Sequence, residues 1–320
     1  MDASWRTSTY KGYLSIIGEN SHIRTEIVPE RGSKLVSIIY KQTGREWIYS
    51  TDISWSKPLH YGMAWEEADR SGWDELFPTI LPCLCPDDFY KGRELPDHGE
   101  LWSLPWDYAI GGSTAELWVK GVQIPYDFKK TYRLEGPELH IHYELHNPTC
   151  HAFSYIWAPH CLVKIEEGMK LSMGNPHSNI LMLHSRMERF EPDGRVDSYP
   201  LIKLSGGKSI DLSVVEPKLN LHAEKYWFVD RQIRGEFEIK TPHTQESLVM
   251  IYSPESLPYL AVWTNYGGYW GDYNLAIEPS TSYLDDVESS FHTGKVKTIN
   301  GNGTESWNLK VLLKQGGVHQ

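Results

Sequence analysis

The sequence predicts an all-β fold, a large antiparallel β-sandwich, and three observations support this prediction. Segments of strand length either alternate apolar with polar residues or run apolar, and they are rich in β-branched and aromatic side chains. Between them, turn signals recur at the spacing of hairpins and meanders, which disfavours βαβ units. No stretch shows the long amphipathic pattern of a helix.

Six segments show the strand pattern most clearly: HIRTEIV (22–28), KLVSIIY (34–40), AELWV (115–119), ELHIHYEL (138–145), SLVMIY (247–252) and SWNLKVLL (306–313). Strands are not evident over residues 51–100 and 175–225, which hold much of the Pro, Gly, Asp and Trp. We expect these two stretches to be loops on which a site is built, because rigid strands commonly carry functional loops.

The domain organisation follows from what the chain lacks. Its 320 residues contain no low-complexity linker, no break in composition and no fixed-period repeat. All-β sandwiches reach this size as one unit. We therefore expect a single domain over residues 1–320.

Charge and aromatic content limit the partners. The formal net charge is −11 and no run of Lys or Arg occurs, so nucleic acid and anionic membrane surfaces are not expected partners. The 13 tryptophans offer flat faces that suit the C–H faces of sugars. A small-molecule sugar is the partner that this composition favours.

The cell compartment and cysteine state are also expectations from sequence. The N-terminus shows no signal-peptide pattern and no window is long and apolar enough to span a membrane, which indicates a cytoplasmic protein. Four cysteines without paired metal-knuckle spacing are expected to be core thiols in a reducing compartment. The oligomeric state stays open, with a homodimer as one alternative.

A metal site is suggested at first by His140, His142, Glu144 and His146, which share one face of a strand. Neighbours on that face stand about 7 Å apart, so all four side chains cannot reach one ion. A solvated sheet face explains the pattern equally well. No metal and no cofactor are predicted, and the common serine hydrolase, nucleotide-binding and zinc-protease motifs are missing.

Scattered residues carry the candidate chemistry. Glu278 ends an apolar run before a proline, where burial would raise the pKa of its carboxyl group toward that of a general base near neutral pH. His160 is flanked by apolar residues, which is also the pattern of a structural interior histidine. His98 lies on the turn Pro96-Asp97-His98-Gly99, and Asp74 and Glu75 follow a Gly-Trp pair.

Taken in order, four segments resemble the aldose 1-epimerase (galactose mutarotase-like) superfamily. They are IRTEIVPERGSKLVSIIYKQTGREWIY near the N-terminus, GWDELFP, PDHGELWSLPW and the closing VWTNYGGYWGDYNLAIEPSTSY. The resemblance spans most of the chain. It implies a β-sandwich of the supersandwich type with an open groove, and cofactor-free interconversion of the α and β anomers of an aldose.

The resemblance also implies roles by position. Glu278 would be the base at O1, His160 the acid at O5, and His98 a donor to the ring oxygen or a neighbouring hydroxyl. A carboxylate of raised pKa and a histidine can each adopt both protonation states near pH 7, as a reversible shuttle requires. Further sugar contacts are predicted at Arg70, Asp74, Glu75 and Lys225, and stacking faces at Trp102, Trp106 and Trp263.

Two departures from the family pattern narrow the substrate. Relatives that act on hexose 6-phosphates carry arginine soon after the His-Gly pair, whereas Glu100 follows Gly99 here and would repel a phosphate. A neutral, non-phosphorylated aldose is therefore predicted. The Asn-Arg pair typical of galactose mutarotases is missing, so galactose itself is not implied.

Two other functions stay open on the same fold. A non-catalytic carbohydrate-binding or sugar-sensing protein would need aromatic and amide groups but no matched acid and base. A lyase or glycosidase would need a second carboxylate at the chemistry, for which Asp74 is the candidate.

Overall fold

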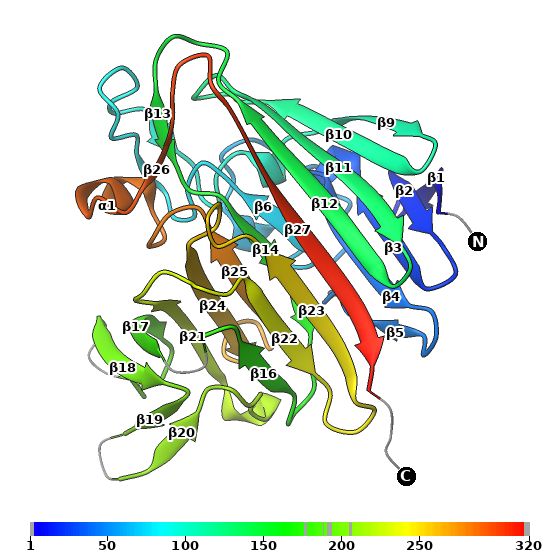
Figure 1. Ribbon diagram of the computed structural model, residues 1–320, viewed down its shortest axis with the longest axis vertical. Coiled ribbons are helices and arrows are strands. Elements are labelled where there is room, and N and C mark those ends of the chain that lie inside the picture. Colours follow the sequence, from blue (N-terminus) through cyan, green and yellow to red (C-terminus); the bar gives the residue numbers. More distant parts are fainter. Residues whose placement is uncertain (1–2, 176–177, 188, 191–193, 205–206, 317–320) are drawn as a thin grey trace.

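Strands dominate the computed structural model, which describes residues 3–175, 178–187, 189–190, 194–204 and 207–316 (Figure 1). Three large antiparallel sheets carry most of the chain, which confirms the all-β prediction. Within the described residues the only α-helix is α1, Val287–His292, whose first turn is capped by the Asp286 side chain. No helix in these residues is long and apolar enough to cross a membrane.

The largest sheet has eight strands and lies in front in Figure 1. Its order is β16 (Lys170–Met173), β22 (Glu236–Lys240), β23 (Glu246–Tyr252), β27 (Thr304–Gln315), β12 (Glu138–His146), β11 (Asp127–Glu135), β10 (Thr114–Lys120) and β9 (Asp107–Gly111). Burial alternates residue by residue along β11 and β12, because one face packs on the core and the other meets solvent.

The second sheet has seven strands and holds the N-terminal part of the chain. Its order is β1 (Ser4–Tyr10), β2 (Tyr13–Glu19), β3 (Ile23–Val28), β4 (Lys34–Tyr40), β6 (Trp73–Leu76) and β14 (Ala158–Cys161), with β5 (Arg45–Glu46) paired to β4. Strand β14 comes from the middle of the chain and pairs with β6, so that His160 lies opposite Asp74.

The third sheet has six strands, in the order β15 (Val163–Lys164), β25 (Tyr273–Ser280), β24 (Tyr259–Tyr266), β21 (His222–Phe228), β17 (Ser178–Ser185) and β18 (Arg195–Tyr199). Strand β14 packs beside β25, and β15, which follows β14 at once, pairs with β25. The edges of the second and third sheets therefore meet.

Short elements complete the fold. The two-stranded pairs are β13 (Phe153–Tyr155) with β26 (Lys297–Ile299), β19 (Leu201–Lys203) with β20 (Ser209–Asp211), and β7 (Cys83–Leu84) with β8 (Glu94–Leu95). The 3-10 turns are η1 (Pro29–Arg31), η2 (Trp65–Glu67), η3 (Leu101–Ser103) and η4 (Lys218–Asn220). One hydrophobic cluster draws buried residues from all three large sheets.

All six segments with the strongest strand pattern form strands, with ends shifted by at most two residues. The loop prediction for residues 175–225 is wrong, because the described part of this stretch forms β17 to β20 and the start of β21. Most of these strands are short, and β17 contains a register shift, so their hydrophobic alternation is weak. Among the cysteines, which are all free, Cys150 is exposed and was wrongly expected in the core.

Candidate active site

A cavity of about 680 Å³ opens where the second and third sheets meet. Volumes of this size are typical of small-molecule sites. Its titratable and aromatic lining residues are Trp65, Glu66, Asp97, His98, His160, His184, Lys225, Trp263, Tyr269, Trp270, Glu278 and Asp285. The cavity thus gathers five of the residues predicted from sequence: Glu278, His160, His98, Lys225 and Trp263.

Sheet register explains why three of these residues face the same side. Lys225 on β21 lies opposite Trp263 on β24, and Trp263 lies opposite Ala276 on β25. Directly opposed residues of antiparallel strands share a face, and so do residues two apart along one strand. Glu278, two residues beyond Ala276, therefore lies on the same face as Lys225 and Trp263.

Glu278 is a fully buried carboxylate that pairs with a buried lysine. Lys225 Nζ donates a hydrogen bond to Glu278 Oε2 and lies 3.8 Å from Asp285 Oδ1. Glu278 Oε1 has no hydrogen-bond partner among the described residues. Burial raises the pKa of Glu278, and the Lys225 ammonium offsets only part of that effect. One carboxylate oxygen is therefore held by a cation while the other is available.

His160 enters the cavity from β14 and is 5% exposed. Burial lowers the pKa of His160 well below its ordinary value, and positive charge at His98, Lys225 and Lys34 lowers it further. The imidazole is thus neutral at pH 7. This contradicts the expectation that His160 populates both protonation states near neutrality.

Trp65, which the sequence did not single out, braces both histidines. Its ring stacks on His98 with centroids 4.9 Å apart and meets His160 edge to face at 4.9 Å. The Trp65 backbone N–H donates to Asp97 Oδ2 at 2.8 Å, and His98 Nδ1 donates to Asp97 Oδ1 at 2.9 Å. Asp97 therefore fixes the ring of His98 and the loop that carries Trp65.

The backbone conformation of the Pro96–Gly99 turn explains part of its sequence. His98 and Gly99 have positive φ of 58° and 73°. A Cβ at position 99 would lie 2.0 Å from the Phe77 carbonyl oxygen, so only glycine fits there. Burial raises the pKa of Asp97, but the hydrogen bond and charge of His98, together with the backbone N–H groups of Trp65 and His98, lower it below its ordinary value, so Asp97 is ionised.

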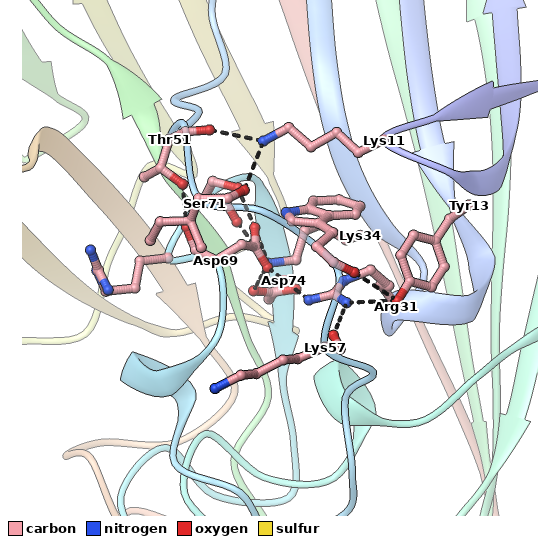
Figure 2. A network of polar contacts seen from close by, with 12 residues as sticks. Lys11, Tyr13, Arg31, Lys34, Thr51, Lys57, Asp69, Ser71 and Asp74 are labelled. Atoms are coloured by element: carbon pink, nitrogen blue, oxygen red, sulfur yellow. Dashed lines mark hydrogen bonds and ion pairs between the residues drawn. The ribbon is translucent and has the colours of Figure 1, made fainter.

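Asp74 lies behind the cavity wall and does not line it. Its Oδ2 accepts a hydrogen bond from Trp65 Nε1 at 2.9 Å and lies 3.0 Å from Lys34 Nζ. Lys34 Nζ also lies 3.1 Å from Asp69 Oδ1, and Arg31 joins this buried network (Figure 2). The predicted sugar contact at Asp74 is wrong for this structure, because its carboxylate anchors Trp65 from the far side.

Three more predicted contacts are core residues outside the cavity lining. Glu75 accepts hydrogen bonds from Lys130, Tyr143 and Trp157. Trp102 and Trp106 are buried and donate to the backbone carbonyls of Asp97 and Leu101. Their indoles stabilise the loop after His98 and offer no face to a ligand in the cavity.

Arg70 also lies outside the lining, but close to the mouth of the cavity. Its Nε donates to Asp272 Oδ2 at 3.1 Å, and its guanidinium carbon lies 4.7 Å from the ring centroid of Trp270. Glu224, the residue before Lys225 on β21, accepts a hydrogen bond from Arg189 Nε at 2.7 Å. Neither residue is placed to contact a sugar inside the cavity.

Glu100 does not line the cavity, so the prediction that its carboxylate repels a phosphate there is wrong. It is completely buried, and its carboxylate accepts from the hydroxyls of Tyr61 and Tyr126 and from the backbone N–H groups of Val122 and Gln123. These contacts hold the 122–126 segment. The position after Gly99 still lacks the arginine that relatives acting on hexose 6-phosphates carry nearby, because Glu100 occupies it.

Several lining residues were missed because their signals are weak in sequence. Asp97 adjoins a predicted histidine in a turn, and a local Asp-His pair could have been recognised. Tyr269 and Trp270 follow the Gly267-Gly268 pair, a signal that by itself predicts only a turn. His184 and Asp285 come from other segments and carry no local signal; His184 Nε2 lies 2.6 Å from the Tyr269 hydroxyl.

The histidine-rich face of β12 is a solvated sheet face. His140 Nε2 lies 2.9 Å from Glu138, His142 Nδ1 lies 2.8 Å from Asn308, and His146 contacts Gly303 and Thr304. Each imidazole thus has its own partner. Within the described residues no group of three or more His, Cys, Asp or Glu side chains could hold a metal ion.

Comparisons with known proteins agree with this architecture. Slr1438 from Synechocystis sp. PCC 6803 is 17% identical over 97% of this chain and 99% of its own, with a TM-score of 0.72. A galactose mutarotase-like protein from Lactobacillus casei is 16% identical over 97% of this chain and all of its own (100%), with a TM-score of 0.67. A galactose mutarotase related enzyme from Lactobacillus acidophilus is 12% identical over 97% of each chain, with a TM-score of 0.63.

No protein-family model matches the sequence, and no curated protein matches it. The structural likeness nevertheless covers nearly the whole chain. The predicted galactose mutarotase-like fold is thereby confirmed.

Proposed function

We propose, from this fold and cavity, that the protein is an aldose 1-epimerase that interconverts the α and β anomers of a neutral, non-phosphorylated aldose. The observation that carries the proposal is one cavity lined by a buried carboxylate, Glu278, by His160 and His98, and by aromatic walls. Ring opening needs a base and an acid on one sugar, and aromatic rings suit its C–H faces.

In the proposed reaction Glu278 takes the proton from the anomeric hydroxyl. The C1–O5 bond then breaks, O1 becomes the aldehyde oxygen, and O5 accepts a proton. Rotation about C1–C2 followed by the reverse steps closes the ring on the other face. Glu278 Oε1, which has no hydrogen-bond partner in the described part of the chain, is the acceptor, and Lys225 favours the ionised carboxylate that a base requires.

His160 is the proposed donor to O5. As a neutral imidazole it presents one N–H to the ring oxygen; the negative charge that develops on O5 draws this proton across, and His160 recovers it from the O5 hydroxyl when the ring recloses. The Asp97–His98 pair faces the same cavity and is a second candidate donor, because the hydrogen bond from His98 Nδ1 to the ionised Asp97 holds the imidazole in a fixed orientation at the cavity wall.

The charges around the cavity support a neutral substrate. Its described lining includes no arginine, and its one lysine, Lys225, is already paired with Glu278. Carboxylates at Glu66, Asp97 and Asp285 add negative charge to the lining. A phosphate would meet no bidentate donor and would be repelled by these groups.

The test is anomer exchange measured by NMR over a panel of neutral aldoses and their 6-phosphates. We expect at least one neutral aldose to be accelerated and its 6-phosphate to be a poorer substrate. Glu278→Gln should lower kcat/KM by about 100-fold or more, because it removes the base. Glu255→Gln, a change of the same chemistry at an exposed position, should match the unchanged protein.

The proposal fails if no sugar is accelerated, or if Glu278→Gln is as active as Glu255→Gln. A non-catalytic sugar-binding protein is then the second candidate. One observation favours it: the lysine contact occupies one oxygen of Glu278. Saturable binding of a sugar without anomer exchange would identify this function.

A further inference from the structure

We propose that the mouth of the cavity carries a second sugar subsite, with the indole of Trp270 as its platform, so that the preferred substrate is the reducing end of a disaccharide or longer oligosaccharide. The inference rests on the proposed function, which places the reacting ring beside Glu278. The glycosidic bond between the sugars stays intact, since only the C1–O5 bond of the reducing-end ring opens and closes.

Trp270 is an aromatic side chain at the boundary between cavity and solvent. It lines the cavity and is 55% exposed. Trp263, Tyr269 and Trp270 form a continuous aromatic series, with ring centroids 5.9 Å apart in the first pair and 5.5 Å in the second. The series leads from the strand face shared with Glu278 outward to solvent, as a chain of sugar rings would.

The backbone at Trp270 adopts a conformation that its residue type disfavours. Trp270 and Gly271 have positive φ of 51° and 70°, and the Asp272 N–H donates to the Tyr269 carbonyl at 2.9 Å. Such turns favour Asn or Gly, and a bulky residue at positive φ is uncommon. Folding alone would favour a smaller residue at position 270, so we infer that the exposed indole serves binding.

The displayed ring is also held in place. Arg70 covers one face of Trp270 at 4.7 Å, and Arg70 is fixed by its hydrogen bond to Asp272 at 3.1 Å. The Tyr49 hydroxyl donates to the other oxygen of Asp272 at 2.8 Å. A preorganised ring loses little conformational entropy when a ligand stacks on it, which is the property of a binding platform.

The size of the cavity supports a second ring. Volumes near its 680 Å³ hold drug-sized ligands, which exceed one pyranose ring. Other large aromatic side chains that are exposed, Phe89, Trp118 and Phe291, do not line it. Exposure combined with cavity lining therefore distinguishes Trp270 from them.

The experiment compares each monosaccharide with disaccharides that share its reducing-end sugar: glucose with maltose and cellobiose, xylose with xylobiose, mannose with mannobiose. We expect a higher kcat/KM for anomer exchange on at least one disaccharide than on its monosaccharide. Trp270→Ala should cut that ratio about tenfold, mainly through KM, as expected for a lost stacking contact. Trp270→Phe should restore part of the loss.

Trp118→Ala removes an exposed indole from β10, away from the cavity, and should leave the ratio unchanged. Equal kcat/KM for every pair, or a ratio in Trp270→Ala equal to that of Trp118→Ala, would overturn the subsite. If no sugar at all is accelerated, the proposed function fails separately. The subsite is then judged by NMR titration with the same disaccharides: weaker binding in Trp270→Ala upholds it, and equal binding overturns it.

Discussion

His160 shows how one buried position sets the state of a functional side chain. At 5% exposure its cationic form loses hydration, and the positive charge of Lys225 and Lys34 disfavours that form further. Its Nδ1 has no partner among the described residues. A neutral imidazole in such a place is a ready hydrogen-bond donor or acceptor and a poor store of a proton.

This state predicts a specific dependence of stability on pH. Because the pKa of His160 is lower in the folded protein than its ordinary value of 6.5, the unfolded chain binds the extra proton first as the pH falls below that value. The group should therefore reduce the free energy of unfolding by about 1.4 kcal/mol per pH unit between pH 6.5 and its lowered pKa. Urea unfolding from pH 8 to pH 5 measures this slope.

His160→Asn, which does not titrate, should show a shallower loss of stability over that range. His243→Asn changes an exposed histidine and should follow the unchanged protein. Parallel curves for the two variants would show that His160 titrates normally in the folded state.

Residue identity was predictable from the sequence, but electrostatic state was not. Glu278 and His160 stand out by their apolar surroundings, and both line the cavity. Burial has the largest effect on the pKa of both groups, and the charges that modify it, such as Lys225 for Glu278 and His98 and Lys225 for His160, lie far away in the chain. No local pattern encodes such partners.

At the scale of elements, the adjacent strands β21, β24 and β25 bring a cation to the catalytic candidate. Lys225 lies two strands away from Glu278 and reaches it across the face that Trp263 shares. The ammonium lowers the pKa of Glu278 against the upward effect of burial. Removal of that charge should therefore raise the pKa of the proposed base.

Lys225→Met tests this coupling through the pH profile of kcat/KM. Since Glu278 acts in its ionised form, a higher pKa leaves less base at any acidic pH, and the acidic limb should move to higher pH. Activity should fall more at pH 6 than at pH 8. Lys225→Arg keeps the charge and should return the limb toward its original position; equal loss at every pH in Lys225→Met would contradict the electrostatic role.

Strand periodicity predicted the central strands of the sheets better than the edge strands. It could also have separated more of the candidate residues by the face of the strand on which they lie. Strands with one buried face, such as β11 and β12, alternate clearly. Short strands such as β18 to β20 have only three to five residues, too few for an alternation to stand out in the sequence, so we expected a loop there. Asp74 and Glu75 are consecutive on β6 and must point to opposite faces, so they could not both contact one sugar.

At the scale of the whole molecule, a buried ion pair joins two of the large sheets. Glu75 on β6 of the seven-stranded sheet lies 3.2 Å from Lys130 on β11 of the eight-stranded sheet, and both side chains are 1% exposed. Tyr143 and Trp157 donate the remaining hydrogen bonds to Glu75. Both charges of the pair find their partners only when the two sheets are correctly packed, so the pair favours this packing over others.

Glu75→Ala should therefore lower the free energy of unfolding by about 3–5 kcal/mol, because it leaves the Lys130 ammonium buried without a counter-charge. Glu116→Ala breaks the surface ion pair between Glu116 and Lys129, whose side chains are 41% and 36% exposed. It should lower the free energy of unfolding by at most about 1 kcal/mol. Both values come from urea unfolding at pH 7.

Glu75→Gln combined with Lys130→Met should be more stable than Glu75→Ala, because no uncompensated charge remains in the core. The KM for sugar of folded Glu75→Gln should equal that of the unchanged protein, since Glu75 does not line the cavity. A small loss of stability together with a raised KM would instead return Glu75 to the sugar site that its sequence position suggested. A large loss with unchanged KM would assign it to the joint between the sheets.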